Sequence, residues 1–215
     1  MTSDHPVADH YRVEPEDQAR AEFYALLARL FSAAPDAALL KAIASAGALA
    51  PVTHTGDAGT VAADFGAAWD RLRAACAAMD PEAAADEFHS LFVGVGRSEV
   101  SPYASHYLGP QSGRPLAEIR AALAELGLAR QPASSEFEDH IAVMLETMRM
   151  LVAGDAGRAP AAIRDQRIFF ERYLAPWAFD CCAAIRESSV ANLYRDVAQF
   201  TRCFLALERD SFAME

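Results

Sequence analysis

Apolar residues recur at helical spacing along most of the chain, and no stretch alternates between apolar and polar residues as a half-buried strand does. Between Phe23 and Phe31 the apolar positions are spaced i, i+3, i+4, i+7 and i+8, which places them on one helical face. A longer stripe follows Ser135 and Glu138, whose S-x-x-E spacing predicts a capping box at the start of a helix. Its apolar members are Phe137, Ile141, Met144, Leu145, Met148, Leu151 and Val152.

Prolines, glycines and capping residues divide the rest of the chain into further helical stretches. They predict helices over 36–47, 61–79, 81–92, 115–127, 160–175 and 190–208, with another that begins at Pro176. We expect residues 1–14 to form a loose leader and residues 51–60 to form a loop. Residues 15–215 then form a single compact all-α domain of eight or nine helices.

The segment 93–113 differs from its surroundings because it is rich in glycine, proline and serine. A long irregular segment inside a compact domain usually carries function or acts as a hinge. We therefore expect a seam at 93–113, with a possible hinge between two helical halves.

Composition agrees with a helical fold, since alanine is the most frequent residue while valine and isoleucine are scarce. The chain has 30 acidic and 19 basic residues, a formal net charge of −11. Such a surface is poorly suited to the phosphate backbone of a nucleic acid and well suited to a basic peptide. We therefore expect no nucleic-acid partner.

The four cysteines form no C-x-x-C pair, which is typical of buried thiols in a reducing compartment. No apolar run approaches the roughly 20 residues that cross a bilayer, and the first residues lack the apolar core of a secretory signal. We expect a cytoplasmic protein without stable membrane insertion.

Motifs for catalysis, metals and nucleotides are missing from the sequence. His89, His106 and His140 lack the Glu-x-x-His spacing of a di-iron bundle, and the H-E-x-x-H zinc motif is absent. The glycines at 94 and 96 resemble the start of a dinucleotide loop, but Glu99 stands where the third glycine belongs. We expect no metal, no cofactor and no catalytic residue.

Two surfaces remain as binding candidates. On a helix that began near Ser135, Asp139 would project opposite the core stripe, beside Val143, Glu146 and Met150, and His140 would be half-buried at the edge of that stripe. A face that mixes carboxylates with apolar residues suits a peptide with arginines next to a hydrophobic run, although a solvated helix face would have a similar composition.

The second candidate surface is an aromatic cluster around the 93–113 segment. Core packing is the default explanation for Phe88, Leu91 and Phe92, which share a helical face. Tyr103 and Tyr107 lie in the glycine- and proline-rich segment, and aromatic residues held by loops often contact partners.

Two blocks of sequence resemble one known family. EFHSLFVGVGRSEVSPYASHY at 87–107 resembles the aromatic-x-x-LF-x-G … P-aromatic-x-S-x-aromatic signature of the TorD/DmsD/NarJ family of molybdoenzyme maturation chaperones. EFEDHIAVMLETM at 136–148 resembles the E-x-x-DHIA-x-x-L-E motif of that family. Weaker matches occur at Arg20, Tyr24, Leu27, Phe31, Pro35 and 174–177, so the matches span most of the chain in family order.

The resemblance implies an all-helical fold without catalytic activity. It implies a chaperone that binds the twin-arginine signal peptide, or its equivalent, of a molybdenum-containing oxidoreductase subunit. The apo-form of that subunit would be held until its molybdopterin cofactor is in place. The expected peptide-binding residues, with neighbours in the same motifs, are Asp139, His140, Glu136, Pro102, Tyr103, Ser105, Tyr107, Phe88, Leu91 and Phe92.

The sequence leaves several alternatives open. A helical enzyme or small-ligand-binding protein would need a buried pocket, and a helical transcription factor would need a basic recognition helix that the acidic amino-terminal residues do not supply. The identity of the client, a monomeric or homodimeric state and any effect of guanine nucleotide are not determined by the sequence.

Overall fold

The chain folds into packed helices, as the apolar periodicity predicts. The computed structural model describes residues 13–49, 57–94, 98–109, 114–128, 137–155 and 157–214. Within them the α-helices are α1 (Pro15–Ser32), α2 (Ala37–Ser45), α3 (Asp57–Ala78), α4 (Pro81–Phe88), α5 (Ala104–Leu108), α6 (Arg114–Glu125), α7 (Ile141–Ala153), α8 (Ile163–Phe169), α9 (Ala175–Glu187) and α10 (Leu193–Met214). Two π-helical turns, η1 (His89–Val93) and η2 (Phe170–Leu174), extend α4 and join α8 to α9.

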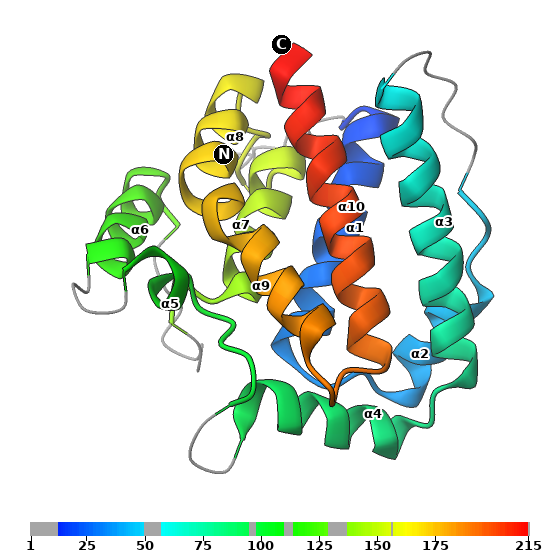
Figure 1. Cartoon of the computed structure of the whole chain (residues 1–215). Helices are drawn as coiled ribbons and strands as arrows, with labels where there is room; N and C mark the ends of the chain where they lie inside the picture. The colour runs from blue at the N-terminus through cyan, green and yellow to red at the C-terminus, as the bar shows by residue number, and fades with distance from the viewer. Residues whose placement is uncertain are drawn as a thin grey trace, which may run out of the picture.

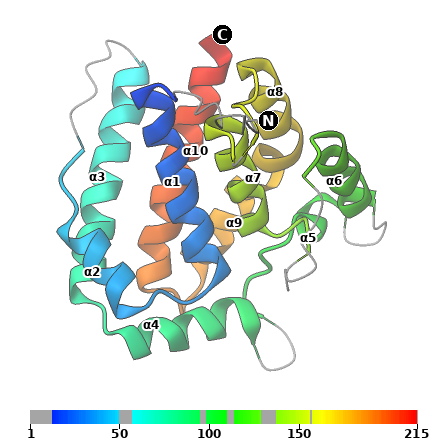
Figure 2. The same ribbon diagram turned by 180° about the vertical axis from the view of Figure 1, so that it is seen from behind.

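The long helices stand side by side as a bundle, and the short ones cover its end and one side (Figures 1 and 2). Helix α1 packs on α7, while α10 packs on both α3 and α9. Helix α4 crosses one end of the bundle, and α5 and α6 project from the side where α9 lies. Helix α5 packs on both α9 and α6, so it connects α6 to the bundle.

Aromatic rings fill the core between α1, α3 and α10. The Phe23 ring lies 5.3 Å from Phe65, 5.9 Å from Trp69, 5.6 Å from Phe200 and 5.7 Å from Phe204, measured between ring centroids. Most of these pairs are edge-to-face, the arrangement that aromatic quadrupoles favour. The apolar stripe that predicted the first helix is therefore part of the core.

A buried ion pair joins the first and last helices. Arg20 of α1 donates two hydrogen bonds to the carboxylate of Glu208 on α10, each 2.8 Å long. The Tyr24 hydroxyl donates to the same carboxylate at 2.9 Å, and Asp17 accepts from Arg20 at 2.7 Å. Paired, charge-assisted bonds of this kind are stronger and more directional than neutral ones. They determine how α10 sits against α1.

A second buried carboxylate caps α10 from a distant part of the chain. Glu87 of α4 is 8% exposed and accepts hydrogen bonds from the backbone N–H groups of Asn192, Leu193 and Tyr194 at 2.7, 3.0 and 2.8 Å. These N–H groups have no partner within the helix, and a negative charge at a helix amino terminus is favourable. Glu87 therefore connects the end of α4 to the start of α10.

The structure corrects several predicted boundaries. Helix α3 begins at Asp57, inside the predicted loop, and α10 begins at Leu193, which leaves Val190 exposed before it. The helix predicted from Ser135 and Glu138 begins only at Ile141, so that part of the prediction is wrong. The short helix α5 lies inside the 93–113 segment that was expected to be irregular.

Some sequence predictions fall on residues outside the described ranges. These are the leader up to residue 12, most of the predicted 51–60 loop, Ser135, Glu136 and parts of the 93–113 segment. The hinge at 93–113 stays a prediction. Among the described helices, none is both long and apolar enough to cross a membrane.

Candidate functional site

Two segments that the sequence singled out separately meet in the structure. The turn at 137–140, just before α7, lies against the 101–105 segment, just before and within α5. The Ile141 N–H donates to the Pro102 carbonyl and the Ala104 N–H donates to the Asp139 carbonyl, each at 2.9 Å. Tyr103 and His140 form an antiparallel bridge between the two segments. Backbone pairing thus joins the two blocks that carry the family resemblance.

Asp139 holds this junction together. Its side chain is almost fully buried, at 2% exposure, and its Oδ2 accepts from the Ser105 N–H at 3.0 Å. Ser105 lies in the first turn of α5, and the residue before that helix, Tyr103, provides no side-chain cap. The carboxylate of Asp139 therefore caps α5 from outside the helix, where negative charge is favourable.

His140 has an equivalent role for α7. It is 5% exposed, and its Nδ1 accepts from the Ala142 N–H at 3.1 Å, so it is the amino-terminal cap of that helix. Neither Asp139 nor His140 lies on α7. The prediction that Asp139 points outward from a helix beside Val143, Glu146 and Met150 is wrong, because the helix starts later than its local sequence suggests.

An aromatic patch made of Tyr103 and Phe137 covers the junction. The two rings lie 6.3 Å apart at an angle of 65°, and the His140 ring lies 5.0 Å behind Tyr103. Phe137 is 51% exposed, although the sequence placed it in the core stripe of the following helix. The turn that precedes α7 directs Phe137 away from the core, so the junction presents an apolar surface to solvent.

Tyr107 fastens the other side of α5 to the bundle. Its hydroxyl donates to the Ser101 carbonyl at 2.9 Å, and its ring stacks on Trp177 of α9 at 5.9 Å. Burial, with a contribution from Cys181, raises the pKa of the Tyr107 hydroxyl well above its ordinary value. Tyr107 is therefore a neutral anchor that is only partly accessible from solvent.

The predicted aromatic residues before the segment belong to the core. Leu91 is fully buried, and Phe88 is 8% exposed. Phe92 is half-buried, and its ring packs on Phe31, Phe88 and Tyr194 at 6.0, 5.3 and 5.2 Å. Neither Leu91 nor Phe88 offers a surface to a peptide in this structure. Core packing, the default interpretation, explains them.

Glu138 follows the patch residue Phe137 directly in the sequence. It is 12% exposed and lies 3.1 Å from the guanidinium of Arg120 on α6, which is 47% exposed. Glu146, on the face once assigned to Asp139, pairs with Arg149 at 2.7 Å. The carboxylates of Asp139, Glu138 and Glu146 thus already hold a helix terminus or a guanidinium.

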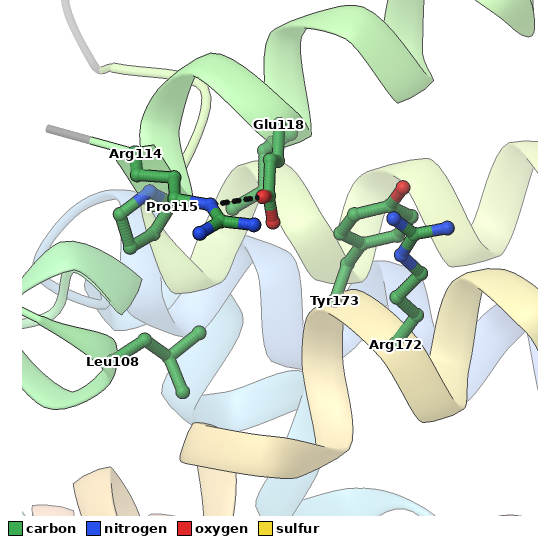
Figure 3. A pocket seen from close by; sticks show the side chains of 7 residues that line it. Leu108, Arg114, Pro115, Glu118, Arg172 and Tyr173 are labelled. Carbon is green, nitrogen blue, oxygen red and sulfur yellow. Dashed lines mark hydrogen bonds and ion pairs between the residues drawn. The ribbon is translucent and has the colours of Figure 1, made fainter.

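The structure contains a pocket that the sequence did not predict (Figure 3). It has a volume of about 260 Å³ and lies between α5, α6 and η2. The lining residues are Leu108, Arg114, Pro115, Glu118, Ile119, Arg172 and Tyr173. They come from three separate elements, so no local motif could have indicated the pocket. In the part of the chain that the structure describes, no three His, Cys, Asp or Glu side chains are grouped as metal ligands.

Comparisons with known proteins agree on one family. The family model described as nitrate reductase delta subunit matches residues 59–183. A chaperone protein TorD from Shewanella loihica is 25% identical over 206 residues, which cover 90% of this chain and 93% of that protein. A second chaperone protein TorD, from Salmonella bongori, is 31% identical over 117 residues, or 54% of this chain and 52% of that protein.

A solved structure shares the fold. It is described as that of a redox enzyme maturation protein from Archaeoglobus fulgidus, and it superposes with a TM-score of 0.56 at 18% identity. The match covers 92% of this chain and 98% of the other. At this identity the similarity establishes the all-helical architecture.

Proposed function

The chain belongs to the nitrate reductase delta subunit family, and from that premise we propose that it is a maturation chaperone for a molybdenum-containing oxidoreductase. In this role it binds the amino-terminal signal peptide of the apo-subunit and shelters it until the molybdopterin cofactor is inserted. The client's peptide carries basic residues followed by an apolar run. The proposal places this action in the cytoplasm, before export or assembly, and assigns no reaction to the chain itself.

The single observation that supports the proposal most is the exposed aromatic patch at the junction of the two family motifs. Phe137 leaves half of its surface in solvent beside Tyr103. Exposed aromatic side chains on a rigid support are typical anchors of protein interfaces. We assign the apolar run of the client peptide to this patch.

Charge supports the same assignment. The net charge of −11 attracts a basic peptide over distances of several ångströms and raises the rate of encounter. Near the patch, Glu138 is engaged by the half-exposed Arg120. In the proposed complex an arginine of the client replaces Arg120 on this carboxylate, since bidentate pairing with a guanidinium suits either partner.

Asp139 and His140 act as positioning residues in this proposal. Both are buried, and each accepts a hydrogen bond from a backbone N–H at a helix amino terminus. They keep the 101–105 segment and the 137–140 turn in register, which orients Tyr103 and Phe137. Pro102 and Ser105 contribute their backbone to the same junction.

Replacement of Phe137 by alanine tests the proposal. Complete burial of a phenylalanine side chain stabilises a complex by about 1.5–3 kcal/mol, and the 51% of Phe137 that is still exposed could contribute about half of that. Phe137→Ala should therefore weaken binding of a twin-arginine peptide roughly fourfold to tenfold. Fluorescence anisotropy with a labelled synthetic peptide, two arginines followed by an apolar run, measures the change.

The matched control is Met214→Ala, which removes an apolar side chain that is 74% exposed at the end of α10. It should leave the affinity unchanged. Equal affinity of the wild type for the twin-arginine peptide and for a scrambled peptide would contradict the function. Unchanged affinity in a folded Phe137→Ala protein would contradict the location of the site.

A further inference from the structure

The pocket between α5, α6 and η2 differs in charge from the surface proposed for the signal peptide. Leu108, Pro115 and Ile119 form apolar walls, and the Tyr173 ring closes one side (Figure 3). Leu108, the last residue of α5, is 40% exposed at the edge of the pocket. An apolar side chain entering the pocket would cover it.

The volume limits what the pocket can hold. Sites for cofactors and drug-sized molecules enclose about 300–1,000 Å³, whereas this pocket encloses about 260 Å³. One branched apolar side chain, with part of the backbone that carries it, fits the smaller space. The volume is thus small for a drug-sized cofactor and sufficient for a side chain of a bound polypeptide.

Among the described residues that line the pocket, Arg172 is the one cation without an ion-pair partner. Arg114 donates to Glu118 at 2.7 Å, so that pair is neutral in sum. Arg172 lies over the Tyr173 ring, with its guanidinium carbon 5.3 Å from the ring centroid. Along the described ranges, no carboxylate forms an ion pair with Arg172. Because Arg114 and Glu118 cancel, Arg172 gives the pocket lining a net positive charge on a chain of net charge −11, which favours an anionic partner.

From these observations we propose that the pocket binds an acidic, apolar segment of the client subunit, with a leucine-sized side chain inserted and an Asp or Glu within one helical turn paired with Arg172. The inference rests on the proposed function, because it assigns a second part of the client to a second surface. The signal peptide is basic and would be repelled by Arg172. The acidic segment therefore belongs to another part of the client.

Charge reversal at Arg172 tests the inference. The probes are three short capped peptides that share leucines at helical spacing and differ at one position, which is Glu, Gln or Arg. The wild type should bind the Glu peptide roughly fivefold more tightly than the Gln peptide, the upper range for a single exposed ion pair. Arg172→Glu should reverse the order, so that the Arg peptide binds most tightly. Isothermal titration calorimetry measures each affinity.

Arg71→Glu is the control, since it makes the same charge change on an exposed residue of α3, on the opposite side of the bundle (Figure 1). It should leave the preference for the Glu peptide intact. Equal binding of the Glu and Gln peptides by the wild type, or an unchanged preference in Arg172→Glu, would overturn the inference. The affinity of the wild type for the twin-arginine peptide is measured in parallel. If the wild type does not bind that peptide, the proposed function is contradicted, independently of the result for the pocket.

Discussion

Replacement of Asp139 distinguishes a residue that positions the site from one that touches the client. The Asp139 carboxylate accepts a hydrogen bond of 3.0 Å from the Ser105 N–H, and Asp139 is only 2% exposed. Asp139→Ala removes this acceptor and leaves the Ser105 N–H without it. An unsatisfied buried donor costs about 1–3 kcal/mol, and loss of a charge at a helix amino terminus costs about 0.3–1 kcal/mol more. The free energy of unfolding should therefore fall by about 2–3 kcal/mol.

Asp139→Asn keeps the shape and one acceptor oxygen, so it loses mainly the charge contribution. It should lower the free energy of unfolding by about 1 kcal/mol. Urea denaturation measures both changes, and hydrogen exchange at the Ser105 amide reports directly on the cap. Asp86→Asn, an equal change of charge at an exposed residue of α4, corrects for weaker long-range attraction.

Affinity for the twin-arginine peptide then decides between the two roles. If Asp139 positions the junction, Asp139→Ala weakens binding and Asp139→Asn restores it to the level of Asp86→Asn. If Asp139 instead contacts a guanidinium of the client, the asparagine variant loses as much affinity as the alanine variant while Ser105 stays protected. That second result would refute the positioning role.

Two further predictions concern stability. Glu87→Ala leaves three backbone N–H groups at the start of α10 without their acceptor, so urea denaturation should show a free energy of unfolding lower by about 3 kcal/mol. Glu87→Gln should lower it less, because one acceptor oxygen remains. Burial raises the pKa of both Cys76 and Cys181 from 9.0 to about 12. As the pH rises, these thiols therefore ionise in the unfolded chain before they ionise in the folded one, and the free energy of unfolding should fall between about pH 9 and 12. A Cys76→Ala, Cys181→Ala double variant should show a shallower fall. An equal slope in the two proteins would contradict this explanation.

Helices stabilised by their own apolar stripes could be predicted from the sequence. The stripe from Ile141 to Val152 is buried in α7 as expected, and Gly154 ends that helix with a positive φ of 75°. Both features depend on residues a few positions apart. The spacing of nearby residues was therefore enough to predict the buried face of α7 and the residue at which the helix ends.

Elements stabilised from a distance could not be predicted. Helix α5 receives its cap from Asp139, 34 residues later, so the sequence around it indicates only a loop. The same contact explains the misplaced start of α7, because pairing of the 137–140 turn with the 101–105 segment prevails over the local S-x-x-E signal. The candidate site lies at this junction, and its exposed members, Phe137 above all, were consequently assigned to the wrong environment.

The bond between Arg20 and Glu208 has a consequence for synthesis of the protein. Its partners are 188 positions apart in the chain. Until α10 has been synthesised, α1 lacks the helix that pairs with Arg20 and covers Phe23. The core is therefore completed only after α10 has been synthesised, and until then α1 keeps apolar surface exposed.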